Sequence, residues 1–209
     1  MGCFYTALAF GFSFMGFVLR EPAVHLHEYS FPDFIVEIGG HFLFGVVAVL
    51  PFIVVSFELV ILAGVLAVTI DIDHLLAALN LNVVSRPAHS FAFLILASLA
   101  FIYIARSLKL GSENRQLLAK QIGFIPAAAI LSHISYDIFA AYGIFSAGES
   151  SFPLFVPFNF QLIPFPYWTW IVFEMMGFFV ALAGLLITRA TSQRDLELRR
   201  SEKEGGDIE

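Results

Sequence analysis

Residues Ile122–Ile144 read IGFIPAAAILSHISYDIFAAYGI, a run of 23 residues in which only His133 and Asp137 ionise near neutral pH. About 20 predominantly apolar residues suffice for a helix to cross the hydrocarbon core of a bilayer. Ionisable groups at that depth are costly, and those that are kept usually serve a function. This stretch therefore predicts a membrane-spanning helix that carries a functional pair of side chains.

The composition of the whole chain agrees with this prediction. Its 209 residues are 59% hydrophobic and 13% charged, with a mean hydropathy of +0.85, whereas a soluble domain carries about 25% charged residues. We expect an all-α, polytopic bundle in the cell membrane, with one transmembrane domain over residues 1–190 and a charged, disordered cytoplasmic tail over residues 191–209.

Charge and cysteine content exclude several classes of function. Basic residues do not form a patch interleaved with aromatic side chains, so no direct binding of nucleic acid is expected. Cys3 is the only cysteine, which excludes an intrachain disulfide and a thiolate metal cluster. Metal ligands in this chain would have to be nitrogen and oxygen atoms.

Apolar runs bounded by polar or proline-containing stretches predict six spans: Phe4–Leu19, His41–Ser56, Glu58–Ile70, Ser90–Ala105, Ile122–Ile144 and Trp168–Thr188. The second and third could form one run. However, the 33 residues from Gly39 to Asp71 would make a helix of about 50 Å, too long for one crossing of a core about 30 Å thick. Two short helices joined near Val54–Glu58 fit better.

The basic residues orient these spans. Nine of the eleven lysines and arginines lie between the fourth and fifth spans or after the sixth, two segments that an even number of spans places on the same side. Since positive loops stay in the cytoplasm, both termini should be cytoplasmic. All six histidines then fall on the outer side or near the midplane, where candidate ligands can converge.

Seven side chains are candidate metal ligands, and they lie at the ends or in the interior of apolar segments: His41, Asp71, Asp73, His74, His89, His133 and Asp137. In Asp71-Ile72-Asp73-His74, two carboxylates repel one another, and a divalent cation would relieve that repulsion. A solvated helix end with interfacial charges is the other interpretation. Acidic residues are unfavourable at a helix C-terminus, which favours metal binding or catalysis.

His133 and Asp137 are four residues apart, so they lie on one face of a helix. Either both bind metal, or Asp137 accepts a hydrogen bond from the second imidazole nitrogen and orients the ring. A buried pair that only aids packing is the third interpretation. His89 precedes Ser90 at a helix start, where the serine is a helix cap rather than a nucleophile.

Three other features leave their role open. His25 and His27 form a His-x-His pair in a polar outer loop, which favours a surface position. Glu174 could be a base near the site or a polar helix contact. Residues Ser151–Tyr167 contain four prolines and five phenylalanines, which forbid a continuous helix. This segment is either an aromatic belt or a wall that places lipid beside the metal.

Five short motifs follow one another along the chain. They are Gly40-His41, then Asp71, Asp73 and His74, then His89-Ser90, then Ser132-His133 with Asp137, and finally Gly148 with Pro153-Leu154 and Pro157. Their order and spacing over residues 39–160 resemble the YdjM-like family. That family is described as inner-membrane metal-dependent hydrolases and sometimes as LexA-binding, which implies a metal-dependent hydrolase here.

One motif departs from the family pattern. Members commonly carry His-Arg-Gly-x-Thr-His-Ser, whereas residues 84–90 of this chain read Val-Ser-Arg-Pro-Ala-His-Ser. The first histidine is missing and Arg86 is displaced by one position. The site either lacks that ligand or receives one from His25 or His27. The family is also similar to the zinc-dependent phospholipase C and P1-nuclease group, an analogy that suggests phosphoester substrates.

These observations predict a metal-dependent hydrolase at the outer membrane face, with one or two divalent ions, zinc above all, and a lipid phosphoester as substrate. Asp73, Asp137 and His89 are the expected catalytic residues, with one of the two carboxylates as the base. A divalent-metal or proton-coupled transporter is the alternative, although the inner halves of the spans offer few polar groups. A scaffold protein stabilised by a metal is a third class.

The cytoplasmic location of both termini is testable with reporter fusions placed after Glu209 and within the Lys109–Lys120 loop. Both fusions should report the cytoplasm because these segments carry most of the basic residues. A signal from the outer side at either position would contradict the assignment.

Overall fold

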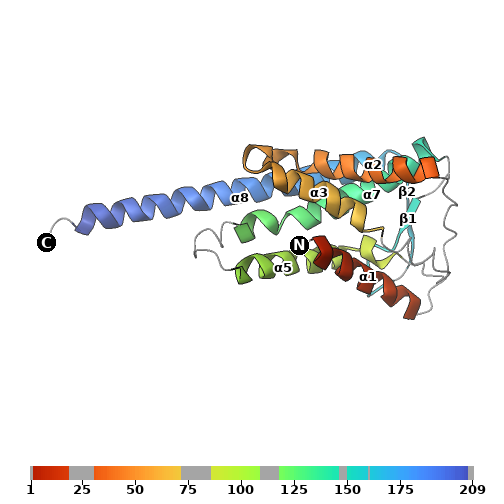
Figure 1. Cartoon of the computed structure of the whole chain (residues 1–209), viewed down its shortest axis with the longest axis horizontal. Helices are drawn as coiled ribbons and strands as arrows, with labels where there is room; N and C mark the ends of the chain where they lie inside the picture. The colour runs from red at the N-terminus through yellow and green to blue at the C-terminus, as the bar shows by residue number, and fades with distance from the viewer. Residues whose placement is uncertain are drawn as a thin grey trace.

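The computed structural model describes residues 2–18, 31–71, 86–108, 118–145, 150–159 and 161–206. This part of the chain forms six α-helices: α1 (Gly2–Val18), α2 (Phe31–Ala48), α3 (Phe57–Thr69), α5 (Phe91–Ser107), α7 (Ile125–Gly143) and α8 (Thr169–Gly206). Figure 1 shows them as a bundle with α8 projecting beyond one end. The predicted helical class is confirmed, with one small addition described below.

Helix α7 is the centre of the bundle and packs against α2, α3, α5 and α8. The helical stretch Leu118–Gly143 is 89% buried over its most apolar window. A helix that is hydrophobic on all sides must be surrounded by other elements or by lipid. Its two ionisable residues, His133 and Asp137, consequently lie inside the protein.

Helix α2 begins at Phe31, ten residues before the predicted start of the second span. The prediction that His41 opens this span was therefore wrong, because His41 lies in the helix interior. Pro32 near the first position and Asp33 in the first turn suit a helix N-terminus. Gly39 and Gly40, which suggested a boundary, are accommodated within the helix.

The break between α2 and α3 lies where the length argument placed it. A short 3₁₀ helix, η1 (Leu50–Val54), follows α2, and α3 begins at Phe57. Pro51 stands at the start of η1, where its missing N–H costs little. The Ser56 hydroxyl accepts a hydrogen bond from Leu59 N–H at 3.3 Å and caps α3, as short polar side chains do at helix starts.

Residues 150–165 add a β-hairpin to the helical bundle. Strand β1 (Ser150–Phe152) pairs antiparallel with β2 (Ile163–Phe165). The prolines of this segment exclude a helix, as predicted, but the pairing of strands was not predicted. The hairpin, the 3₁₀ helix η2 (Pro87–His89) and the first residues of α5 lie at the same end of the bundle (Figure 1).

Two of the described helical stretches are long and apolar enough to cross a membrane, Leu118–Gly143 and Thr169–Thr191. Shorter apolar helices cover Gly2–Ser13, Phe57–Thr69 and Phe91–Ser107. The window in Thr169–Thr191 is only 33% buried by the protein, so most of its apolar surface would face lipid if the helix spans a bilayer.

Helix α8 continues to Gly206, through most of the segment that was expected to be a disordered tail. Residues 191–206 are therefore helical, contrary to the expectation of disorder. The reason lies in their composition, because leucine, glutamate, glutamine, arginine and lysine favour helix strongly. The expectation of disorder was based on the high charge of this segment and did not take the helix propensities of its residues into account.

Glycines allow α2 and α3 to approach closely. A Cβ on Gly45 would lie 2.8 Å from the Ala63 carbonyl oxygen and 2.8 Å from Ala67 Cβ. A Cβ on Gly64 would lie 2.7 Å from the Phe42 ring. The contact at Gly45 is with backbone, which cannot rotate away, so this position tolerates no side chain.

We expect Gly45→Ala to destabilise the protein by about 1–3 kcal/mol, the usual cost of overpacking, and to lower its thermal unfolding temperature in detergent. Gly39→Ala is the matched control in the same helix, since a Cβ there meets nothing within 4 Å. It should leave stability unchanged or raise it slightly. Equal unfolding temperatures for the two variants would contradict the close packing of α2 on α3.

Candidate metal centre

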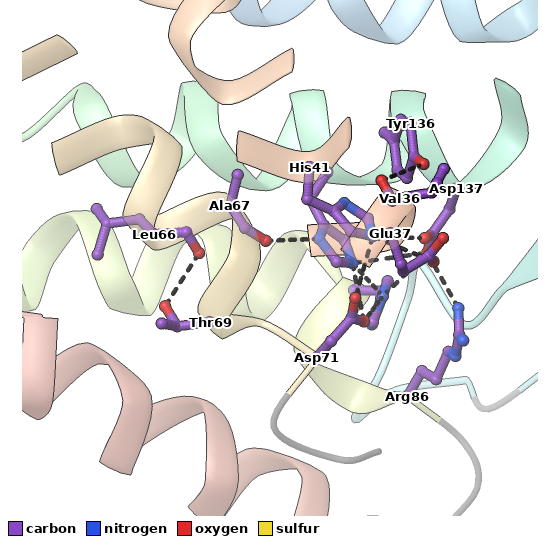
Figure 2. Close-up of polar contacts among 12 residues, drawn as sticks. Val36, Glu37, His41, Leu66, Ala67, Thr69, Asp71, Arg86, Tyr136 and Asp137 are labelled. Carbon is purple, nitrogen blue, oxygen red and sulfur yellow. Dashed lines mark hydrogen bonds and ion pairs between the residues drawn. The ribbon is translucent and has the colours of Figure 1, made fainter. Parts of the chain in front are cut away.

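Five ionisable side chains from four segments converge in the interior of the bundle. His41 comes from α2, Asp71 from the residues after α3, and His89 from η2, while α7 supplies both His133 and Asp137. Figure 2 shows His41, Asp71 and Asp137 pointing toward one another. The three histidines are at most 1% exposed.

The imidazole Nε2 atoms face the carboxylates. His41 Nε2 lies 3.0 Å from Asp71 Oδ2 and 3.3 Å from Asp137 Oδ1. His133 Nε2 lies 3.3 Å from Asp71 Oδ1, and His89 Nε2 lies 3.3 Å from Asp137 Oδ2. One ligand atom from each of His41, Asp71, His133 and Asp137 can be chosen so that all lie within 4.8 Å of one another.

These separations suit a metal ion. In a tetrahedral site with bonds of about 2.0–2.1 Å, ligand atoms are about 3.3 Å apart. The nitrogen–oxygen distances of 3.0–3.8 Å around Asp71 and Asp137 span this value. Three imidazoles and two carboxylates form a nitrogen and oxygen donor set that divalent zinc accepts.

The tautomer of His133 also fits a ligand. Its Nδ1 lies 2.7 Å from the Ala67 carbonyl oxygen, which can only accept a hydrogen bond, so Nδ1 carries the proton. The lone pair is then on Nε2, which points into the cluster and accepts a hydrogen bond from His89 Nε2 at 2.7 Å. A backbone carbonyl that fixes the second nitrogen in this way is a common support for metal-binding histidines.

This arrangement bears on the two roles considered for Asp137. The second nitrogen of His133 meets Ala67, so Asp137 does not orient the ring through it. Asp137 Oδ2 instead lies 3.5 Å from His133 Nε2, the nitrogen that faces the cluster. The geometry therefore favours His133 and Asp137 as two ligands of one centre.

Aromatic packing holds the imidazoles in place. The rings of His41 and His133 stack at a centroid distance of 4.0 Å, and the Tyr136 ring lies in edge-to-face contact with His41 at a centroid distance of 4.5 Å. The Tyr136 hydroxyl donates to the Val36 carbonyl oxygen at 3.1 Å, and its ring occupies the space that a Cβ on Gly40 would need. The Gly-His pair is thus explained by ring packing against His41.

Glu37 joins the cluster and was missed by the sequence analysis. It lies one helical turn before His41, with Oε1 3.5 Å from His41 Nε2, and it is 7% exposed. Its Oε2 atom is buried and has no hydrogen-bond partner among the described residues. The signal was the spacing Glu37-x-x-x-His41, the same as in His133 and Asp137. Because α2 was expected to begin at His41, this spacing was not recognised as helical.

Arg86 reaches the same centre. Its guanidinium Nη1 donates to Asp137 Oδ2 at 3.0 Å, and the side chain is 20% exposed. The backbone of Arg86 has φ 40° and ψ 52°, a left-handed conformation that is uncommon for residues other than glycine. Although the arginine is displaced from its position in the family motif, its side chain contacts a residue of the cluster.

Other predicted residues lie elsewhere. Asp73, His74, His25 and His27 are outside the described residues. Ser90 is confirmed as a cap, since its hydroxyl accepts from Phe93 N–H at 3.2 Å. Both carboxylate oxygens of Glu174, on α8, are buried without a hydrogen-bond partner among the described residues, and Glu174 is not one of the residues grouped at the centre.

A family model, that of the YdjM inner membrane protein, matches residues 36–198. The chain belongs to the YdjM inner membrane protein family. No curated protein and no solved structure matches it. All five side chains of the centre, together with Glu37 and Arg86, lie within the region matched to YdjM. Membership of an inner-membrane family agrees with the two stretches that could span a bilayer.

We expect His41→Ala, His133→Ala and Asp71→Asn each to abolish stoichiometric metal binding by the purified protein, since each removes a ligand. Glu37→Gln should weaken metal affinity about tenfold, as changes in groups beside ligands do. The metal content of each dialysed protein would be measured by inductively coupled plasma mass spectrometry.

Glu174→Gln is the matched control, because Glu174 is also a glutamate with buried oxygens in an apolar helix. It should leave the metal content unchanged. Full metal retention by the three ligand variants would contradict a shared centre, and so would a loss in Glu174→Gln as large as theirs.

Proposed function

We propose that the chain is a membrane-embedded, metal-dependent hydrolase that cleaves a phosphoester of a lipid or other amphipathic molecule. The observation that carries this proposal is the convergence of three imidazoles and two carboxylates in a buried position next to an arginine. A divalent metal held there would lower the pKa of a bound water and neutralise charge on a phosphoryl oxygen. Zinc fits the donor set best.

The number of donors argues for chemistry rather than structure alone. A structural zinc site is closed by four protein ligands, and a catalytic one keeps a position for water or substrate. Here five donors and Glu37 crowd one centre, and bidentate or bridging carboxylates can serve one or two ions. His41, Asp71, His133 and Asp137 would be the ligands in either case, with His89 hydrogen-bonded beside them.

Arg86 is placed to receive the substrate. A guanidinium has five N–H donors in a planar fork, which suits phosphoryl oxygens as well as carboxylates. Arg86 contacts Asp137 at the buried centre, and its side chain is 20% exposed. A phosphoester that approaches the centre would meet this residue.

The six-span topology with cytoplasmic termini belongs to the same proposal, and it would place the centre toward the outer face.

A transporter would need a polar path from the centre to the opposite end of the bundle. The buried side chains along α3 and α7 in that direction are mainly apolar: Val60, Ala63, Leu66, Ile125, Ala128 and Ile130. Because these side chains offer no polar path for an ion, they favour the hydrolase over the transporter.

The purified, metal-loaded protein should hydrolyse a phospholipid or a soluble phosphodiester such as bis(p-nitrophenyl) phosphate. Chelator treatment or Asp137→Asn should lower the rate at least ~100-fold, since the first removes the metal that would activate water and the second removes one of its carboxylate ligands. Release of phosphate or nitrophenol provides the measurement, with the metal content of each variant determined on the same sample.

Glu174→Gln, which lies outside the centre, should keep the wild-type rate. Metal-loaded protein that hydrolyses neither ester, yet moves divalent ions into proteoliposomes, would replace the hydrolase with the transporter.

A further inference from the structure

An apolar groove of about 420 Å³ lies between α5 and the turn that follows β1. Ile95, Leu96 and Leu99 form part of the helical wall, and Leu154, Phe155 and Phe158 form part of the other. Every residue that lines it is hydrophobic. No function discussed so far accounts for a concave surface at this place.

Both walls begin at residues that are fixed to the metal centre. Phe91, which lines the groove, is two residues after His89, and its N–H donates to the Leu154 carbonyl oxygen at 3.0 Å. Phe152, two residues before Leu154, stacks on the His89 ring at a centroid distance of 5.5 Å. One end of the groove is therefore joined to the centre through the backbone on each side.

The groove then runs away from the centre along the helix. The lining residues of α5 are Phe91, Ala92, Ile95, Leu96 and Leu99. Their spacing of three and four residues places them on one face of the helix. At about 1.5 Å of rise per residue they cover about 12 Å of the helix axis. A molecule held in the groove would thus have one end near His89 and extend parallel to α5.

The chemistry of the lining identifies the occupant. Ile95 is 57% exposed, Leu99 58% and Phe158 92%, so the groove is open along its length to an apolar ligand. A peptide would leave its backbone N–H and C=O groups without partners here, which is costly in an apolar environment. A hydrocarbon chain has no such groups.

We propose that the groove binds an acyl chain of the lipid whose phosphoester is cleaved at the metal centre. This inference rests on the proposed function, and it adds the part of the substrate that is recognised. The centre would take the polar headgroup, and the groove would hold the chain parallel to α5, as lipid chains lie in a bilayer.

The test compares Leu96→Trp, which would fill the groove, with Leu186→Trp. Leu186 is an apolar residue on α8, 55% exposed and outside the groove. Leu96→Trp should raise KM for a long-chain phospholipid about tenfold or more, because the indole would occupy the space of the chain. Its rate on bis(p-nitrophenyl) phosphate and its metal content should equal those of the wild type. Leu186→Trp should change none of these values.

Native mass spectrometry of the detergent-purified proteins supplies a readout that does not depend on activity. Wild type and Leu186→Trp should retain a phospholipid that Leu96→Trp has lost. Retention of that lipid by Leu96→Trp, or equal effects of Leu96→Trp on both esters, would overturn the groove assignment. If the wild type cleaves neither ester, the hydrolase proposal fails, whereas the retained lipid still decides whether the groove binds a chain.

Discussion

The His41 imidazole meets carboxylates from three segments, with Nε2 3.0 Å from Asp71, 3.3 Å from Asp137 and 3.5 Å from Glu37. Carboxylates held so close together in an apolar bundle repel one another, and each pays a desolvation cost. Positive charge near the centre is therefore a condition for this packing. Arg86 supplies part of it at Asp137, and a divalent cation among the Nε2 atoms would supply the rest.

The packing of the helices is arranged around this condition. Gly45 and Gly64 bring α2 and α3 into close contact, and the Ala67 carbonyl on α3 in turn meets His133 on α7. That single hydrogen bond fixes which nitrogen of His133 faces the centre. A change in the spacing of α2 and α3 would therefore alter the ligand geometry even though neither glycine touches a ligand.

Much of this could be predicted from sequence because it depends on local rules. The helical class, the break before Ser56 and the cap at Ser90 all follow from hydropathy, spacing and the short motifs. Of the seven candidate ligands grouped in the same way, five lie among the described residues and converge, whereas Asp73 and His74 lie outside them. The start of α2 could not be predicted in this way, since a Gly-Gly pair usually interrupts a helix. Gly40 lies inside a helix because the Tyr136 ring, which comes from α7, occupies the space that a side chain at this position would need.

The same limit applies to Glu37, Arg86 and the hairpin. Glu37 was hidden by the wrong helix boundary. Arg86 approaches Asp137 across 51 residues of sequence, and its left-handed backbone conformation follows no local rule for arginine. The pairing of β1 with β2 joins residues on either side of a turn whose prolines indicated only that a helix was excluded. Each of these features depends on tertiary contacts that spacing along the chain does not encode.

The ends of the helices set the level at which the centre lies in the bundle. Asp71 lies just after α3 ends and His89 just before α5 begins, whereas His41 lies in the interior of α2 and His133 in that of α7. The centre therefore sits at the level where α3 and α5 end and α2 and α7 continue. Among the described residues, η2 and the hairpin lie at this end of the bundle (Figure 1), and one face of α5 leads away from it with an apolar lining. A substrate that is polar at one end and apolar along its length matches that change in surroundings, because each part meets the environment it favours.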